Sequence, residues 1–290
     1  DLLVSEHCPA ALVAARIRGL PARAVGSGFT VPPARTPMPS LQPWRELPRR
    51  RLEQAEDRIR AALNAVLVRH DAHPLAALAE LYPSAATRLL NFPELDHYGL
   101  REEAVCLGPP AAEPGGAAVD FPSGTGPTLF AYYHPAYRHF DRVLEALRRC
   151  GHRVLLVAPG LAPERARALS GARLRVLGRQ CELAAVLPAA DLALLHGGEG
   201  TLVRALLAGT PTIVVPEFLE QSLLAHRLAA RDLLIAVHPA LNRPLPALPD
   251  LAGILRDQAH AAARARFVAR HGDHDPGRTR DALGRWLLAA

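Results

Sequence analysis

The sequence predicts an α/β fold made of two parallel-sheet domains, of which the amino-terminal one is incomplete. Three observations lead to this prediction. Residues 128–237 contain six short apolar stretches that alternate with helical patterns, as in a doubly wound parallel sheet. Residues 2–25 contain one strand–helix–strand unit of the same kind. Residues 110–127 are rich in proline, glycine and alanine and are expected to form a linker.

These signals divide the chain into two predicted domains. Residues 1–109 are expected to be the remainder of an amino-terminal domain, and residues 128–290 a second domain that ends in helices. Asp1 is followed at once by an apolar strand, without an initiator methionine or a lead-in. A complete protein rarely begins inside a strand, so we expect that an amino-terminal piece is missing.

The first region alternates between apolar segments and a proline-rich one. A strand, a helix with Gly19 as its C-cap and a second strand form a parallel unit. Residues 31–48 hold too many prolines for a regular element and are expected to form a surface loop. The expected strands are Leu2–Ser5, Ala22–Val25 and Arg88–Phe92, and the expected helices are Pro9–Gly19, Leu52–Arg69 and Pro74–Leu81.

The second region has the regular alternation of a doubly wound sheet, in which ligands lie beyond the carboxyl ends of the strands. The expected strands are Thr128–Tyr133, Arg153–Ala158, Leu174–Leu177, Leu192–Leu195, Thr212–Val215 and Leu234–Val237. The expected helices are Phe140–Arg149, Pro163–Leu169, Glu182–Leu187, Thr201–Leu207 and Leu219–Arg231, followed in the tail by 250–270 and 276–288.

The composition excludes several functional classes. The net charge is +6, yet the sequence contains no lysine, so all 34 basic side chains are arginines. A Walker A loop and a Schiff-base lysine are therefore excluded. Nucleic-acid binders usually gather basic and aromatic residues into a patch, whereas here the arginines are dispersed and aromatic residues make up 5%. We do not expect nucleic acid as a partner.

Cysteines, histidines and apolar runs argue against metal, disulfide and membrane-spanning classes. The four cysteines are widely separated and lack a Cys-x-x-Cys pair, which fits a reducing cytoplasm. The densest histidine cluster, residues 271–275, is expected to be a solvated loop, so no metal site is predicted. The sequence contains neither a signal peptide nor an apolar run long enough for a membrane span. We expect a cytoplasmic protein without integral membrane association.

The stretch 191–201, Asp-Leu-Ala-Leu-Leu-His-Gly-Gly-Glu-Gly-Thr, is the most informative part of the chain. A strand leads to His196, and a glycine-rich turn leads into a helix for which Thr201 is the expected N-cap. Amides at a helix start favour an anion, and glycines let a ligand approach the backbone. His196 can donate to a phosphate oxygen, so we expect a diphosphate site. The alternative is a tight turn whose glycines serve packing alone.

Three motifs in this order resemble the donor-binding signature of GT-B nucleotide-sugar glycosyltransferases of the family-1 kind, which include UDP-glycosyltransferases and bacterial macrolide-type enzymes. The motifs are His-Gly-Gly-x-Gly-Thr at 196–201, Ala-Gly-Thr-Pro at 208–211, and Pro216 followed by the pair Glu220-Gln221. The resemblance is best over residues 127–240 and weaker over 1–109. It implies two Rossmann-like domains facing a cleft, the amino-terminal one incomplete here.

The resemblance implies a role for each matching residue. The residues implied to bind the donor diphosphate are His196, Gly197, Gly198, Gly200 and Thr201. Those implied to bind hydroxyls of the donor sugar are Glu220 and Gln221, because a carboxylate and a carboxamide can each hold two hydroxyls. The alternative for this pair is an exposed first turn of a helix. Those expected to face the cleft are Tyr133, His134, Arg179 and Pro216.

Some positions depart from the family pattern. Glu199 stands where the family more often has a small or neutral residue, and a carboxylate beside a diphosphate is repulsive. The base-stacking aromatic of plant relatives is absent from residues 178–183. The family's general base is a histidine near the start of the amino-terminal domain, held by an acidic residue. Glu6 falls on or near that acidic position and is the expected orienting acid, whereas the base histidine has no counterpart in this chain.

The resemblance implies a metal-independent, inverting glycosyltransferase. Such an enzyme moves a sugar from a UDP- or dTDP-sugar to a hydroxyl of a small-molecule acceptor. No cofactor is expected besides this nucleotide-sugar co-substrate, and a fragment without the base histidine would be inactive. Two alternatives stay open: a non-catalytic relative that binds nucleotide sugars or helps another protein, and a sugar-nucleotide epimerase on the same scaffold.

Overall fold

The computed structural model describes residues 1–99, 101–110, 115–236 and 257–289. The chain divides into two compact units, one formed by Asp1–Pro110 with Asp275–Ala290 and the other by Ala111–His274. This division assigns the last helix to the first unit, whereas the sequence analysis places it with residues 128–274. Among the described residues, no helix is both long enough and apolar enough to cross a lipid bilayer.

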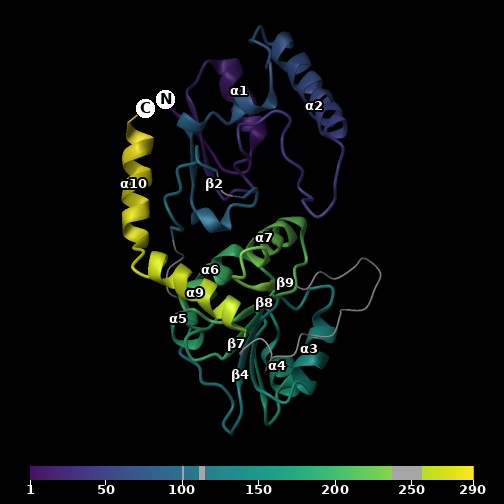
Figure 1. Cartoon of the computed structure of the whole chain (residues 1–290), viewed down its shortest axis with the longest axis vertical. Coiled ribbons are helices and arrows are strands. Elements are labelled where there is room, and N and C mark those ends of the chain that lie inside the picture. The colour runs from purple at the N-terminus through teal and green to yellow at the C-terminus, as the bar shows by residue number, and fades with distance from the viewer. Residues whose placement is uncertain (100, 111–114, 237–256, 290) are drawn as a thin grey trace. The chain divides into compact units, whose positions relative to one another are not determined.

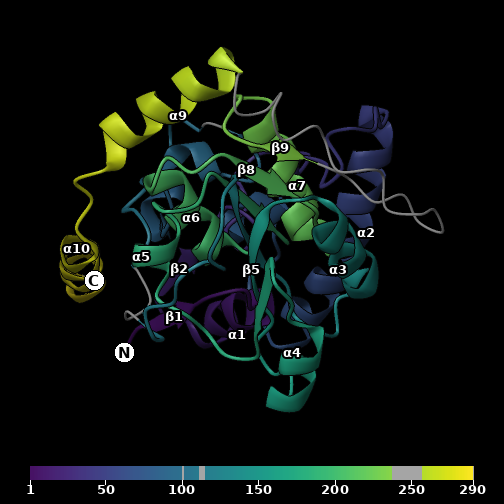
Figure 2. The same ribbon diagram turned by 90° about the horizontal axis from the view of Figure 1, so that it is seen from below.

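The first unit contains a parallel sheet in the order β1-β2-β3, formed by Leu3–Ser5, Ala22–Gly26 and Thr87–Leu89. Helix α1, Pro9–Arg18, connects β1 to β2 and packs against both strands (Figure 2). Pro9 suits the first position because its missing N–H needs no partner there. Gly19 ends the helix in the left-handed conformation, with a φ of 63°. The predicted strand–helix–strand unit therefore forms.

Helix α2, Arg49–Arg69, is joined to the segments around it by Glu56, whose side chain is buried. One Glu56 oxygen accepts the N–H of Met38 at 2.7 Å, and the other accepts the N–H of Leu78 at 3.4 Å. A buried carboxylate is tolerated here because backbone donors replace its hydration. Glu56 thus fixes the proline-rich segment against the helix that follows it.

The predicted helix 74–81 is wrong except for its last turn. Asn64 donates to the carbonyl of Leu75 at 2.9 Å and accepts its N–H at 2.7 Å, so neither backbone group is left for a helix. The strand predicted at 88–92 is shorter in the structure, where β3 ends at Leu89. Short 3₁₀ turns occupy Leu78–Leu81, Ser84–Ala86 and Pro93–Leu95.

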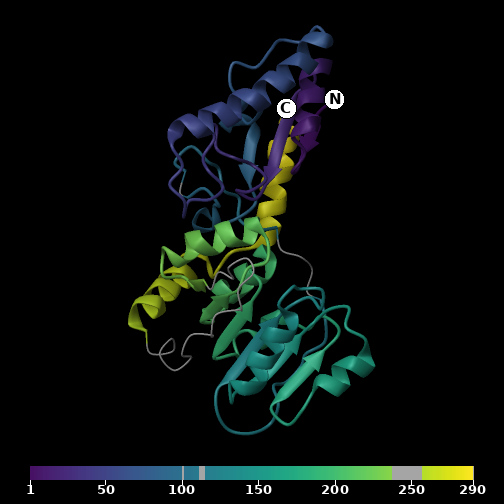
Figure 3. The ribbon, with the colours of Figure 1, turned by 90° about the vertical axis from the view of Figure 1, so that its right-hand side faces the viewer.

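Helix α10, Pro276–Leu288, belongs to the first unit and lies beside its strands (Figure 3). Two guanidinium groups lie over the Trp286 ring, with the Cζ atoms of Arg23 and Arg88 each 4.5 Å from the ring centroid. Thr279 adds a hydrogen bond from its hydroxyl to the Leu107 carbonyl at 2.6 Å. These contacts tie the end of the chain to β2 and β3.

The second unit contains a six-stranded parallel sheet in the order β6-β5-β4-β7-β8-β9. Strands β4, β7, β8 and β9 are labelled in Figure 1. Its strands are β4 Thr128–Tyr132, β5 Arg153–Val157, β6 Leu174–Leu177, β7 Leu192–Leu195, β8 Thr212–Val214 and β9 Ile235–Ala236. The chain adds β5 and β6 on one side of β4, and then returns to add β7, β8 and β9 on the other. The order of the strands therefore reverses between β4 and β7.

Five helices of the second unit connect successive strands, as the sequence predicts. They are α3 Phe140–Arg149, α4 Pro163–Leu169, α5 Leu183–Val186, α6 Glu199–Leu207 and α7 Leu219–Ala229. Helix α9, Gln258–His271, comes after the last strand of the sheet. Every residue of β7 and β8 is buried, which explains their continuous apolar pattern. Val237 of the last predicted strand and residues 250–256 of the predicted tail helix lie outside the described residues.

We predict that Trp286→Ala loosens α10. The substitution removes two cation–π contacts and leaves two like charges facing each other, a local loss of about 1–3 kcal/mol. Hydrogen exchange measured by mass spectrometry is then expected to accelerate in residues 276–288. Trp44→Ala is the matched control, because Trp44 is the other tryptophan and is 43% exposed. Unchanged exchange in α10 after Trp286→Ala would show that the ring does not anchor the helix.

Candidate functional site

The candidate site lies at the carboxyl ends of β4 and β7, where the strand order reverses. These strands are neighbours, with Tyr132 opposite Leu195 in the register, so the residues after them meet at one edge of the sheet. His196 follows β7, and its ring centroid lies 5.8 Å from that of Tyr132. In open parallel sheets, ligands bind outside the carboxyl ends of the strands at such a reversal.

The glycine turn after His196 has a steric cause at two positions. Gly197 has a φ of 93°, and a Cβ there would lie 2.8 Å from Val214 Cγ1. A Cβ on Gly198 would lie 2.6 Å from Cε1 of the His196 ring. Gly200 has open space around its Cα. Packing therefore explains why Gly197 and Gly198 are glycines. Among the described residues, no neighbouring atom lies close to the Cβ position of Gly200, so the start of the helix is open at that residue.

The amino-terminal end of α6 faces the turn. The helix begins at Glu199, two residues earlier than predicted, so Gly198 is the N-cap and the prediction of Thr201 as N-cap is wrong. As a glycine, Gly198 has no side chain with which to cap this end. The first helical bond runs from the Leu202 N–H to the Gly198 carbonyl at 3.1 Å, so the amides of Gly200 and Thr201 precede it. Such amides and the helix dipole favour an anion.

His196 is held by two hydrogen bonds to its Nδ1 atom. The backbone N–H of Gly198 donates to Nδ1 at 3.1 Å, and Nε2 of Gln221 lies 3.2 Å from the same atom. Burial lowers the pKa of His196, the Glu220 carboxylate opposes this by raising it, and His134 lowers it further. The lowered pKa favours a neutral imidazole near pH 7.

Glu220 and Gln221, predicted together as sugar ligands, occupy different environments in the first turn of α7. Glu220 is half-buried, and Gln221 is only 7% exposed. The Gln221 Oε1 atom accepts the N–H groups of Glu217 at 2.9 Å and Phe218 at 3.3 Å. Its carboxamide is therefore bonded to the protein on both sides, and a sugar role for it stays a prediction.

Two of the four residues expected to face a cleft are buried instead. Tyr133 is fully buried and donates from its hydroxyl to the Leu195 carbonyl at 2.9 Å, so it belongs to the core of the second unit. Pro216 is buried as well. His134 and Arg179 are exposed, and a place in a cleft stays a prediction for them.

Tyr132 also lies at this edge, although the sequence analysis selected its neighbour Tyr133 for the cleft. The other four residues of β4 are buried, because both faces of the sheet are covered, and only its last residue, Tyr132, is partly exposed. Tyr132 is half-buried beside His196, and its hydroxyl hydrogen-bonds to Gln180. Burial raises its pKa. The pair of tyrosines at the strand end was the signal for it, but the sequence does not say which one faces outward.

The first unit holds the predicted orienting acid. Glu6 is exposed and directly follows β1. His7, next to it, has a φ of 51°, and its ring lies 5.8 Å from that of Phe29. The role of Glu6 stays a prediction.

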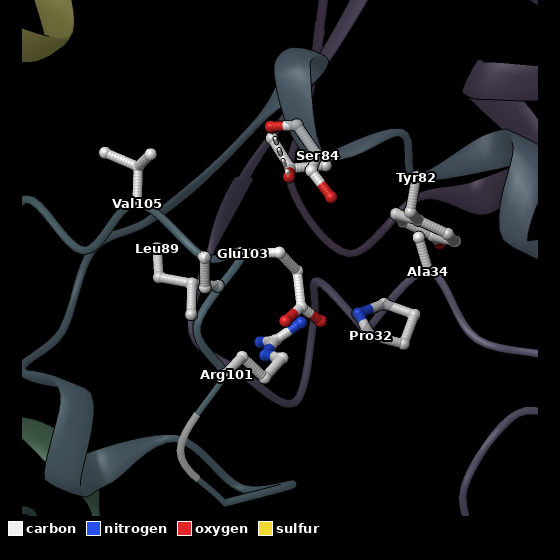
Figure 4. Close-up of a pocket in the computed structure, with 10 residues that line it drawn as sticks. Pro32, Ala34, Tyr82, Ser84, Leu89, Arg101, Glu103 and Val105 are labelled. Carbon is white, nitrogen blue, oxygen red and sulfur yellow. Dashed lines mark hydrogen bonds between the residues drawn. The ribbon is translucent and has the colours of Figure 1, made fainter.

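A small pocket in the first unit lies near β3 (Figure 4). Its volume is about 10 Å³, which holds about one water molecule. It is thus too small for an acceptor. The residues that line it include Pro32, Ala34, Tyr82, Ser84, Leu89, Arg101, Glu103 and Val105.

Comparisons with known proteins agree with this geometry. No family model matches the chain. The elloramycin glycosyltransferase ElmGT of Streptomyces olivaceus is 36% identical over 122 residues, which are 39% of this chain. The matched stretch spans only 30% of the length of that relative.

Solved structures of glycosyltransferases match nearly the whole chain. The calicheamicin glycosyltransferase CalG4 has a TM-score of 0.69 at 18% identity, covering 99% of this chain and 73% of its own. The spinosyn rhamnosyltransferase SpnG complexed with thymidine diphosphate has a TM-score of 0.61 at 18% identity, covering 98% and 72%. At this identity the likeness establishes the fold. The chain therefore has the α/β fold of GT-B glycosyltransferases, and the resemblance indicated by its motifs is confirmed.

Proposed function

We propose that this chain binds a nucleotide sugar and belongs to an inverting glycosyltransferase. The donor would be a UDP- or dTDP-sugar, and the sugar would pass to a hydroxyl of a small-molecule acceptor. The observation that carries the proposal is the meeting of His196 with the uncapped start of α6 at the reversal between β4 and β7. This is a site for a diphosphate in a sheet whose relatives in fold are sugar-transfer enzymes.

The comparisons support both substrates by analogy. SpnG has been crystallised with thymidine diphosphate and also with spinosyn aglycone. A nucleoside diphosphate and a hydroxylated small molecule are the corresponding ligand classes proposed for this chain. The identity of the acceptor is not part of the proposal.

The mechanism proposed for the site concerns the leaving group. When the bond from the sugar to the diphosphate breaks, negative charge grows on the departing phosphate oxygen. The amides of Gly200 and Thr201 and the Nε2 atom of His196 would hold that charge in a fixed geometry. The acceptor hydroxyl loses its proton to a general base, and Glu6 is proposed as the acid that orients this base. Glu220 would bind hydroxyls of the sugar.

One observation favours a second candidate, a nucleotide-sugar-binding protein without turnover. Glu199 begins α6 and brings a negative charge to the end of the helix where the diphosphate would lie. The chain is incubated with dTDP-glucose and a panel of hydroxylated acceptors, and the products are analysed by mass spectrometry. Transfer or hydrolysis of the sugar would exclude the non-catalytic candidate.

We predict that His196→Ala weakens binding of dTDP and UDP. The loss of one hydrogen bond to a charged group is worth about tenfold or more in affinity, measured by isothermal titration calorimetry. His152→Ala is the control, since His152 precedes β5 at the opposite edge of the sheet. Equal affinity in wild type and His196→Ala, or no binding by wild type, would contradict the proposed donor site.

A separate prediction concerns the sugar. Glu220→Ala is expected to leave dTDP affinity nearly unchanged and to weaken dTDP-glucose binding by about fivefold to tenfold, because only the sugar loses an acceptor. Glu217→Ala, in the exposed loop three residues earlier, is the control. If Glu220→Ala weakens the binding of dTDP and of dTDP-glucose equally, the Glu220 carboxylate does not bind the sugar.

A further inference from the structure

The carboxamide of Gln221 can adopt one orientation only. Its Oε1 atom faces two backbone donors, the N–H groups of Glu217 at 2.9 Å and Phe218 at 3.3 Å. The reverse orientation would place an NH₂ group against two N–H groups, and hydrogen bonds between donors do not form. The NH₂ group of Gln221 therefore faces His196 Nδ1, 3.2 Å away, and acts as a donor.

A second donor converges on the same ring nitrogen. The backbone N–H of Gly198 lies 3.1 Å from His196 Nδ1, and a backbone N–H cannot accept. With donors on two sides, Nδ1 must present its lone pair. A neutral imidazole carries one proton, so that proton is on Nε2.

We propose that Gln221 is a positioning residue that holds His196 in the tautomer protonated on Nε2. The ring then offers a hydrogen-bond donor, and not a lone pair, to an anion at the start of α6. The proposal rests on the proposed function for the identity of that anion, a nucleoside diphosphate. The tautomer is a property of the free protein and can be tested without a ligand.

His134 provides an internal reference. Its Nδ1 atom accepts the N–H of Ala136 at 3.1 Å, so the backbone alone favours the same tautomer there. His134 is exposed and follows β4. A substitution at Gln221 is thus expected to change the signals of His196 and to leave the tautomer of His134 as it was. The charged groups that act on the His196 ring are Glu220 on α7 and His134 itself.

The decisive variant is Gln221→Glu. A carboxylate keeps an oxygen for the two backbone donors and replaces the NH₂ group by a second acceptor. An acceptor facing Nδ1 favours a proton on that nitrogen, and its negative charge raises the titration midpoint of His196. The ring nitrogens are followed by ¹⁵N nuclear magnetic resonance of the ligand-free chain, with His196 assigned from His196→Asn.

In wild type above the titration midpoint, we expect a pyridine-like signal for Nδ1 and a pyrrole-like signal for Nε2. In Gln221→Glu, we expect the Nδ1 signal to move toward the pyrrole-like value and the midpoint to rise. Gln221→Met removes the donor without adding charge, and we expect a signal between the two tautomers. These variants also separate positioning from support of the fold, because a structural role alone predicts lower stability with the tautomer unchanged.

Two results would overturn the proposal: a pyridine-like Nε2 in wild type, or Nδ1 signals unchanged in both folded variants. Affinity for dTDP is measured in parallel and is expected to fall by about tenfold in Gln221→Glu. If wild type binds no dTDP while the tautomer responds as described, the proposed function fails and the role of Gln221 stands. If dTDP binds and the tautomer does not respond, the proposed function stands and the role of Gln221 fails.

Discussion

The reversal of strand order between β4 and β7 is the constraint on which the second unit depends. The chain leaves β4 toward β5 on one side and leaves β7 toward β8 on the other, and ligands of open parallel sheets bind at the carboxyl ends of strands at such a reversal. The buried apolar strands hold this edge in place, and the glycines after His196 allow the chain to turn sharply into α6. A polar site on a rigid apolar support is the result.

A hydrogen-bonded group joins four segments at this edge. Gln221 links the loop after β8, the start of α7 and the His196 ring, and Gly198 links that ring to the start of α6. These bonds fix the orientation of the His196 ring, and with it the Nε2 atom proposed to hold a diphosphate. Preorganised donors of this kind need little rearrangement when charge develops on a bound group, which is the main source of electrostatic catalysis.

Much of the second unit follows from the sequence because its signals are local. Continuous apolar runs mark the buried strands, and His196 with its glycines marks the turn that follows one of them. Other features depend on contacts between residues distant in sequence. Examples are the burial of Tyr133, whose hydroxyl bonds to the Leu195 carbonyl, and the orientation of the Gln221 carboxamide toward His196. The packing of Arg23 and Arg88 against Trp286 has the same character, since the two arginines are about 200 or more residues away from Trp286 in the sequence.

A crystal structure of the chain with dTDP tests the central claim most directly. Diphosphate oxygens are expected within hydrogen-bond distance of His196 Nε2 and of the amides of Gly200 and Thr201. A diphosphate bound elsewhere, for example beside Arg148 and Arg173 at the opposite edge of the sheet, would contradict the account.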